Sequence, residues 1–113
     1  MTMDSLTGKI IGCAIEVHRF LGPGLLESAY AQCLAWELKK EDLAFEIEKP
    51  MPVMYKGVTL DCGYRIDFLV ENKVIVELKA VSEIKDIFKA QILSYMKLSS
   101  VSTGLLINFN VSY

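Results

Sequence analysis

Two carboxylates and a lysine interrupt a strongly apolar stretch of the chain, residues 64–80. Two runs of β-branched and apolar residues predict two strands joined by a turn at residues 71–73. With a three-residue turn, Asp67 falls opposite Glu77, and Lys79 lies two residues farther along the same face. Adjacent carboxylates repel, so one has a raised pKa unless a cation lies between them. A hard divalent ion such as Mg²⁺ or Mn²⁺ removes this conflict, since it prefers oxygen ligands.

A surface ion pair explains the same spacing. Lys79 could neutralise Asp67 or Glu77 across the strands, on a face that water covers. A slip of one residue in the pairing would move Asp67 to the other face. The spacing alone therefore leaves a metal site and an ion pair as open alternatives. The alternation also predicts two sets of side chains that each share a face, Ile66, Phe68 and Val70 on the first strand and Val74, Val76 and Leu78 on the second.

The elements around this hairpin are predicted from apolar periodicity and turn residues. The third helix is expected to start after Ser82, which is a good N-cap. The order of elements predicts an α/β fold with one mixed sheet, in a single domain of residues 1–113. The expected helices are residues 6–19, 25–40 and 83–98, and the other expected strands are residues 43–49, 53–55, 58–60 and 103–109, the last of them buried.

Two predicted helices each turn one polar side chain towards their apolar face. Glu27 lies in the first turn of the second helix, three residues before Tyr30 on the same stripe. Gln91 lies in the middle of the apolar face of the third helix. A buried glutamate or amide needs a partner, so both can be expected to point to the polar side chains of the hairpin. Alternatively, Glu27 faces the free amides at the start of its own helix, and Gln91 bonds to main chain.

The composition limits the class of protein. The chain has 113 residues and a net charge of −2, so no basic field draws the whole molecule to nucleic acid or to a membrane. We expect a cytoplasmic protein, since no signal peptide and no stretch of ~18 apolar residues is present. Hydrophobic residues make up 52%, which predicts a homo-oligomer, with a dimer as the favoured state.

The single histidine and the three cysteines do not form a metal-ligand pattern. Cys13, Cys33 and Cys62 are widely spaced and are expected to be buried thiols. His18 is expected to bind the free carbonyls at the end of the first helix. The sequence therefore predicts neither a zinc site nor a disulfide framework.

The chain resembles the GxxExxY family, a branch of the PD-(D/E)XK restriction-endonuclease-like superfamily. Residues 24–30, which read G-L-L-E-S-A-Y, resemble the G-x-x-E-x-x-Y motif after which the family is named. The superfamily signature is similar to Asp67 followed by Glu77-Leu78-Lys79. The resemblance covers nearly the whole chain. It implies an α-β-β-β-α-β core with a mixed central sheet flanked by helices.

The resemblance also implies a metal-dependent nuclease site that hydrolyses phosphodiester bonds in nucleic acid. It implies Mg²⁺, replaceable by Mn²⁺, held by Asp67, Glu77 and the main-chain carbonyl of Leu78. It implies that Lys79 orients or deprotonates the attacking water and offsets charge in the transition state. Glu27 would be a further catalytic acid that reaches the metal directly or through water. The other side chains implied to line the pocket are Tyr30, Gln91 and Tyr95.

The implied partner is nucleic acid, with DNA favoured over RNA. The lysines and arginines are scattered along the chain, so low sequence specificity is expected. The alternative is a non-catalytic interaction module that retains the nuclease fold and uses the acidic pocket to bind a structural metal or a partner.

Overall fold

The computed structural model describes residues 1–112, and its elements follow the predicted order. The predicted hairpin, the shorter hairpin before it and the crossover helix are all present. The elements are α1 (Met3–Leu21), α2 (Glu27–Lys40), β1 (Phe45–Pro50), β2 (Val53–Tyr55), β3 (Val58–Leu60), β4 (Arg65–Val70), β5 (Val74–Lys79), α3 (Asp86–Ser99) and β6 (Thr103–Asn108).

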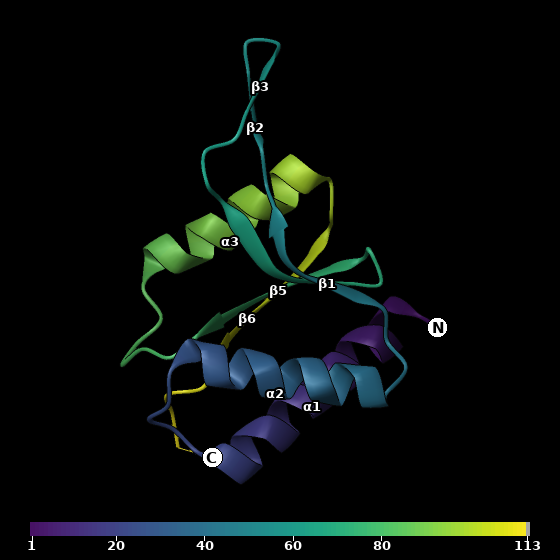
Figure 1. Cartoon of the computed structure of the whole chain (residues 1–113), viewed down its shortest axis with the longest axis vertical. Coiled ribbons are helices and arrows are strands. Elements are labelled where there is room, and N and C mark those ends of the chain that lie inside the picture. Colours follow the sequence, from purple (N-terminus) through teal and green to yellow (C-terminus); the bar gives the residue numbers. More distant parts are fainter. Residues whose placement is uncertain (113) are drawn as a thin grey trace.

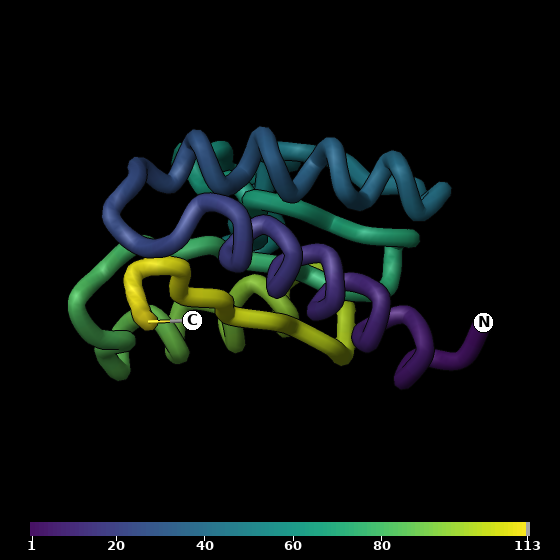
Figure 2. Tube along the Cα trace, turned by 90° about the horizontal axis from the view of Figure 1, so that it is seen from below, coloured from purple at the N-terminus to yellow at the C-terminus, as the bar shows by residue number. Residues whose placement is uncertain are grey.

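The main sheet has the strand order β1-β4-β5-β6. β4 pairs antiparallel with β1 and β5, whereas β6 runs parallel to β5 after the crossover through α3. α1 and α2 form one layer against one face of the sheet, and α3 packs on the other face (Figure 1). Figure 2 shows α1 and α2 side by side in that layer. The prediction of an α/β fold with a mixed central sheet flanked by helices is confirmed.

β2 and β3 form a separate two-stranded hairpin that extends away from the main sheet (Figure 1). Its bounds are those predicted. Lys56 and Gly57 at the turn both have positive φ, 49° and 80°, as the tight hairpin turns require. Most side chains of the two strands are exposed, so this hairpin adds little to the core.

The core under the α1–α2 layer is built from the apolar stripes of both helices. Tyr30, Leu34 and Leu38 of α2 are fully buried, whereas Leu26 is 78% exposed. The reason is that α2 begins at Glu27, so Leu26 is only the N-cap residue. The buried residues of α1 are Leu6, Ile10, Cys13, Ala14 and Val17.

Ile66 lies on the opposite side of the sheet from its predicted neighbours. Phe68 and Val70 pack towards α1 and α2, whereas Ile66 joins the apolar cluster beneath α3. The alternation of β4 breaks at Asp67. Opposite this residue, Glu48 of β1 has a left-handed φ of 50°, and the regular pairing of the two strands skips from Ile47–Phe68 to Lys49–Ile66. On β5 the predicted face is confirmed, since Val74, Val76 and Leu78 all pack towards α1 and α2.

The start of α3 differs from the prediction. The helix begins at Asp86 rather than after Ser82, and its N-cap is Lys85, without a side-chain cap. Two hydrogen bonds hold the preceding segment in a non-helical course. The Asn108 side chain accepts from the Val81 amide at 3.1 Å and donates to the Val81 carbonyl at 2.9 Å. A contact from residues far along the chain therefore overrides the local capping signal.

β6 is half-buried rather than buried, because it lies at the edge of the sheet. Its inner side is nevertheless closely packed. A Cβ atom at Gly104 would lie 2.7 Å from the Met96 sulfur, so the glycine lets α3 approach the strand.

Several smaller predictions can be compared with the structure. The Nε2 atom of His18 lies 2.7 Å from the Val111 carbonyl oxygen, so it contacts the end of the chain rather than a carbonyl of its own helix. Cys13 is buried and Cys33 half-buried, but Cys62 is exposed, contrary to expectation, because it lies in the loop at the base of the hairpin. Within residues 1–112 no helix is long and apolar enough to cross a membrane.

Candidate functional site

The β4–β5 hairpin has the predicted register. Its connection has three residues, and Val70 pairs with Val74. Glu71 and Asn72 in this turn both have left-handed φ, 54° and 55°. The ladder continues to the Phe68–Val76 pair, and the next residues in register are Asp67 and Glu77. The two carboxylates therefore meet where regular pairing stops.

Asp67 and Glu77 are joined by reciprocal bonds to main-chain amides. Glu77 Oε2 accepts from the Asp67 amide at 2.6 Å, and Asp67 Oδ2 accepts from the Leu78 amide at 2.8 Å. Each carboxylate thus takes the place of a carbonyl from the opposite strand. Charge-assisted bonds of this kind are short and hold both side chains in one orientation. Each carboxyl group keeps a second oxygen that these two bonds do not use.

Burial dominates the electrostatics of the pair. Glu77 is only 5% exposed, and its pKa is raised to about 7, mainly by this burial. The negative charge of Asp67 also raises this pKa, whereas the bond from the Asp67 amide and the charge of Lys79 lower it. Burial also raises the pKa of Asp67, against the bond from the Leu78 amide and the charge of Lys79. The pair therefore holds a proton more readily than free carboxyl groups do.

Lys79 does not neutralise the pair by direct contact. In the described part of the chain it forms no ion pair with Asp67 or Glu77 within 4.0 Å. Its Nζ atom lies 4.8 Å from the centroid of the Phe88 ring on α3, within the range of a cation–π interaction. Its carbonyl accepts from the Phe109 amide, which anchors its main chain to the end of β6. The surface ion-pair interpretation of the spacing is thus wrong.

Glu27 lies at the first position of α2 and faces the hairpin. It lines a cavity of about 180 Å³ together with Asp67, Phe68 and Leu78. Its negative charge contributes to the raised pKa of both Asp67 and Glu77. Glu27 is also exposed to solvent, whereas the sequence predicted it to be buried. Its charge therefore needs no partner to offset a cost of burial.

Tyr30 does not line this cavity, contrary to expectation. It is fully buried, and its ring stacks on Phe109 at a centroid distance of 4.5 Å. Its hydroxyl donates to the Gly22 carbonyl at 2.6 Å and accepts from the Leu25 amide at 3.2 Å. Gly24, between them, has φ of 103°, a conformation that favours glycine. Tyr30 and Gly24 therefore shape the loop that places Glu27 at the start of α2.

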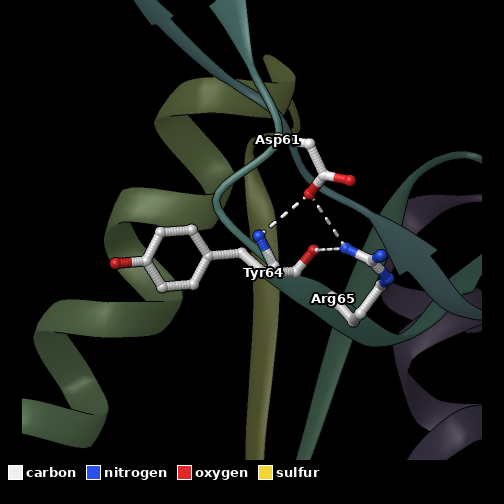
Figure 3. Close-up of polar contacts among 4 residues, drawn as sticks. Asp61, Tyr64 and Arg65 are labelled. Carbon is white, nitrogen blue, oxygen red and sulfur yellow. Dashed lines mark hydrogen bonds and ion pairs between the residues drawn. The ribbon is translucent and has the colours of Figure 1, made fainter.

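Gln91 and Tyr95 lie on the α3 side of the sheet. Both line a groove of about 440 Å³, closed on one side by Tyr64. Burial raises the pKa of Tyr95, and the charges of Glu77 and Asp67 raise it further. The Tyr95 hydroxyl therefore interacts electrostatically with the carboxylate pair. The Tyr64 ring extends towards α3 (Figure 3). It lies edge-on to the Tyr95 ring, with the ring centroids 6.0 Å apart.

Bonds around Arg65 hold the segment that carries Tyr64. The Arg65 guanidinium donates to the Tyr64 carbonyl at 2.8 Å and lies 3.5 Å from Asp61 (Figure 3). Asp61 also accepts from the Gly63 amide at 2.9 Å, and Gly63 has φ of 80°. These contacts hold the bend before β4, from which the Tyr64 ring extends towards α3.

Glu48 is a candidate site residue that sequence reasoning missed. It lies opposite Asp67, lines the same cavity, and its charge raises the pKa of Asp67. The alternation of residues 45–49 suggests an ordinary edge strand, in which Glu48 would be a solvated side chain. Its φ of 50° cannot be read from the sequence, since glutamate has no special preference for that conformation.

The comparison with known families decides the classification. The PD-(D/E)XK nuclease superfamily matches residues 4–113. The chain belongs to this superfamily. No curated protein and no solved structure matches it. Membership implies a nucleic acid substrate, and PD-(D/E)XK nucleases are generally dependent on divalent metal ions.

The donor atoms of this PD-(D/E)XK protein fit a hydrated divalent ion. Within residues 1–112 no three His, Cys, Asp or Glu side chains lie close enough to hold a metal by themselves. Mg²⁺, however, binds through one or two carboxylates and keeps several waters. Asp67 and Glu77 offer two hard oxygen donors, and burial raises the pKa of both. A bound cation would offset this cost of burying their charge. The arrangement suits such an ion and does not suit one coordinated by protein alone.

Proposed function

We propose that this PD-(D/E)XK protein is a metal-dependent nuclease that hydrolyses phosphodiester bonds, with Mg²⁺ as its ion and DNA as its substrate. The observation that carries the proposal is the carboxylate pair of buried Glu77 and half-buried Asp67, cross-bonded to main-chain amides, beside a lysine that neither carboxylate binds. A purely structural pair would be expected to recruit that lysine, because unpaired buried charge is costly.

In this proposal Asp67, Glu77 and the main-chain carbonyl of Leu78 hold the ion. When bound, the ion would supply a Lewis acid for the scissile phosphate and lower the pKa of a water. Lys79 orients or deprotonates the attacking water and offsets negative charge that develops on the phosphate. The Phe88 ring keeps its ammonium group near the pair without an ion pair that would have to break.

The remaining residues have supporting roles. Glu27 is an additional acid that reaches the ion directly or through water, from the wall of the cavity that also holds Asp67. Gln91 and Tyr95 line the groove on the other face of the sheet. The contacts of Tyr30 with the Gly22–Leu25 loop explain in structural terms why the glycine and the tyrosine of the G-x-x-E-x-x-Y pattern at residues 24–30 accompany the glutamate. They support the proposal that the chain belongs to the GxxExxY branch.

The first experiment is a titration of Mn²⁺ by calorimetry, with the wild type and with Glu77→Gln. Binding to the wild type that Glu77→Gln abolishes supports a metal at the pair. Each protein is then incubated with single-stranded and double-stranded DNA and RNA in Mg²⁺. Cleavage by the wild type alone supports the nuclease. Failure to bind Mn²⁺, even with oligonucleotide present, would favour a non-catalytic interaction module that retains the fold.

We also propose that the protein is a homodimer. Large apolar side chains outside the candidate site remain exposed, among them Phe20 at 73% and Leu26 at 78%. Exposed apolar surface of this kind favours association. Light scattering at several protein concentrations tests the proposal, and a monomer throughout would contradict it.

A further inference from the structure

A second hollow adjoins the candidate site. It is a trough of about 560 Å³ between α2 and β1. Its α2 wall carries Trp36 and Lys39, and its β1 wall carries Phe45 and Ile47. Trp36 is 61% exposed and Ile47 is 49% exposed, so both walls of the trough present large apolar surface to solvent. Nothing in the proposed hydrolysis accounts for that surface.

The trough is continuous with the cavity that holds Asp67. The two share a border formed by Ser28, Ala31, Ile47 and Glu48. The α2 residues that line the trough run from Ser28 to Lys39, which spans about 16 Å along a helix. One end therefore opens at the carboxylates, and the other lies two to three helical turns away.

The chemistry of the far end suits a nucleic acid strand. The Trp36 ring offers a flat surface on which a base can stack, and Lys39 lies beside it in the wall. The Lys40 Nζ atom lies 5.5 Å from the Trp36 ring centroid, which adds a second positive charge. Aromatic rings next to lysines are the usual means of binding unpaired bases and their phosphates. A base within a duplex cannot stack on a side chain in this way.

We infer that the trough is the path of an unpaired nucleic acid strand, with a base stacked on Trp36 and phosphates near Lys39 and Lys40. The inference rests on the proposed function and specifies its substrate as nucleic acid with a single-stranded segment. Two features favour this occupant over a second protein chain. The trough runs directly into the phosphodiesterase site, and its charge changes from positive at the far end to negative at the carboxylates.

Trp36 is itself the probe for this inference, because it is the single tryptophan of the chain. Its fluorescence is measured while oligothymidylate is added in the presence of EDTA, which prevents cleavage. Saturable quenching is expected, and a matched duplex should quench much less. An oligouridylate of the same length shows whether the trough distinguishes deoxyribose from ribose. Binding of the same strands is followed in parallel by anisotropy of a labelled oligonucleotide.

Variants separate stacking from a general loss of structure. Trp36→Ala should weaken binding of the single strand about 5- to 150-fold, the range expected for loss of one stacked base. Trp36→Phe keeps an aromatic surface and should lose much less. Tyr55→Ala removes another exposed aromatic ring, on β2 and outside the trough, and should bind as the wild type does. Circular dichroism establishes that each variant is folded.

Each other outcome overturns the inference. Binding that leaves the Trp36 emission unchanged, or that Trp36→Ala retains in full, places the strand elsewhere and leaves the nuclease proposal standing. Equal affinity for the duplex also rejects an unpaired strand. A shift of the emission with protein concentration alone would mean that a second copy covers the trough. Absence of binding to any nucleic acid, with or without metal, would overturn both proposals.

Discussion

Among single residues, Glu77 makes the stability of the metal-free protein depend on pH. Its pKa is about 7 in the folded protein and near 4.5 when exposed. Between these values the folded state keeps a proton that the unfolded state has lost, so stability falls as the pH rises through this range and levels off above it. Asp67, whose pKa is also raised, acts in the same direction. The loss from Glu77 should be on the order of 3 kcal/mol.

Urea denaturation in EDTA at a series of pH values measures this effect. Glu77→Gln should flatten most of the slope and should be as stable as the wild type, or more so, at pH 8, because it removes a buried charge. The glutamine oxygen can still accept from the Asp67 amide. If the variant instead loses several kcal/mol at pH 8, the carboxylate is a structural anchor rather than a group awaiting a cation.

Lys79 is expected to affect cleavage and not metal binding. Lys79→Ala should bind Mn²⁺ as the wild type does, because no contact with the carboxylate pair is removed. It should lose cleavage, because Lys79 is the residue proposed to orient or deprotonate the attacking water. Phe88→Leu should lower the cleavage rate about 2- to 5-fold, since an exposed cation–π interaction contributes about 0.5–1 kcal/mol. Leu93→Ala, exposed on the same helix, is the matched control. An unchanged rate in Phe88→Leu would show that the ring does not position the ammonium group.

At the scale of elements, the loop before α2 depends on one buried hydroxyl. Tyr30→Phe leaves the Gly22 carbonyl and the Leu25 amide without this partner, which should destabilise the protein by about 1–3 kcal/mol. It should also lower cleavage, because the start of α2 carries Glu27. Tyr55→Phe, on the exposed hairpin, should change neither quantity. Denaturation and cleavage assays of both variants test this, and a Tyr30→Phe protein of wild-type stability would contradict it.

Local patterns predicted the elements well where neighbours in sequence decide the structure. The alternation and the three-residue turn sufficed for the register that brings Asp67 to Glu77. Distant contacts decided the failures. Asn108 holds Val81 and delays α3, and the break in pairing at Glu48 changes the side on which Ile66 packs.

The candidate site shows the same division. Asp67, Glu77 and Lys79 come from one hairpin, and its register places them together. Tyr30 was expected in the pocket because it shares a helical stripe with Glu27, but a stripe specifies only a face. The loop that folds back to the Tyr30 hydroxyl turns it into a support instead. The trough beside Trp36 is formed by a helix and a strand from separate parts of the chain, so no local sequence motif predicts it.

For the molecule as a whole, the projecting β2–β3 hairpin implies that stability is unevenly distributed. The two strands pair only with each other, and most of their side chains are exposed. Met51, buried and bonded through its amide to the Tyr64 carbonyl at 2.9 Å, is the last firm anchor before the hairpin. A lone two-stranded hairpin is marginally stable in water. It should therefore open without unfolding the sheet.

Amide hydrogen exchange would make this visible. Amides of β2 and β3 should exchange nearly as fast as those of an unfolded peptide, whereas those of β4 and β5 should exchange only through global unfolding. Slow exchange throughout the hairpin would mean that something covers it in solution. If the prediction holds, two parts of the molecule move on different timescales. The β2–β3 hairpin opens and closes rapidly, while the main sheet stays rigid and keeps the carboxylates of Asp67 and Glu77 fixed.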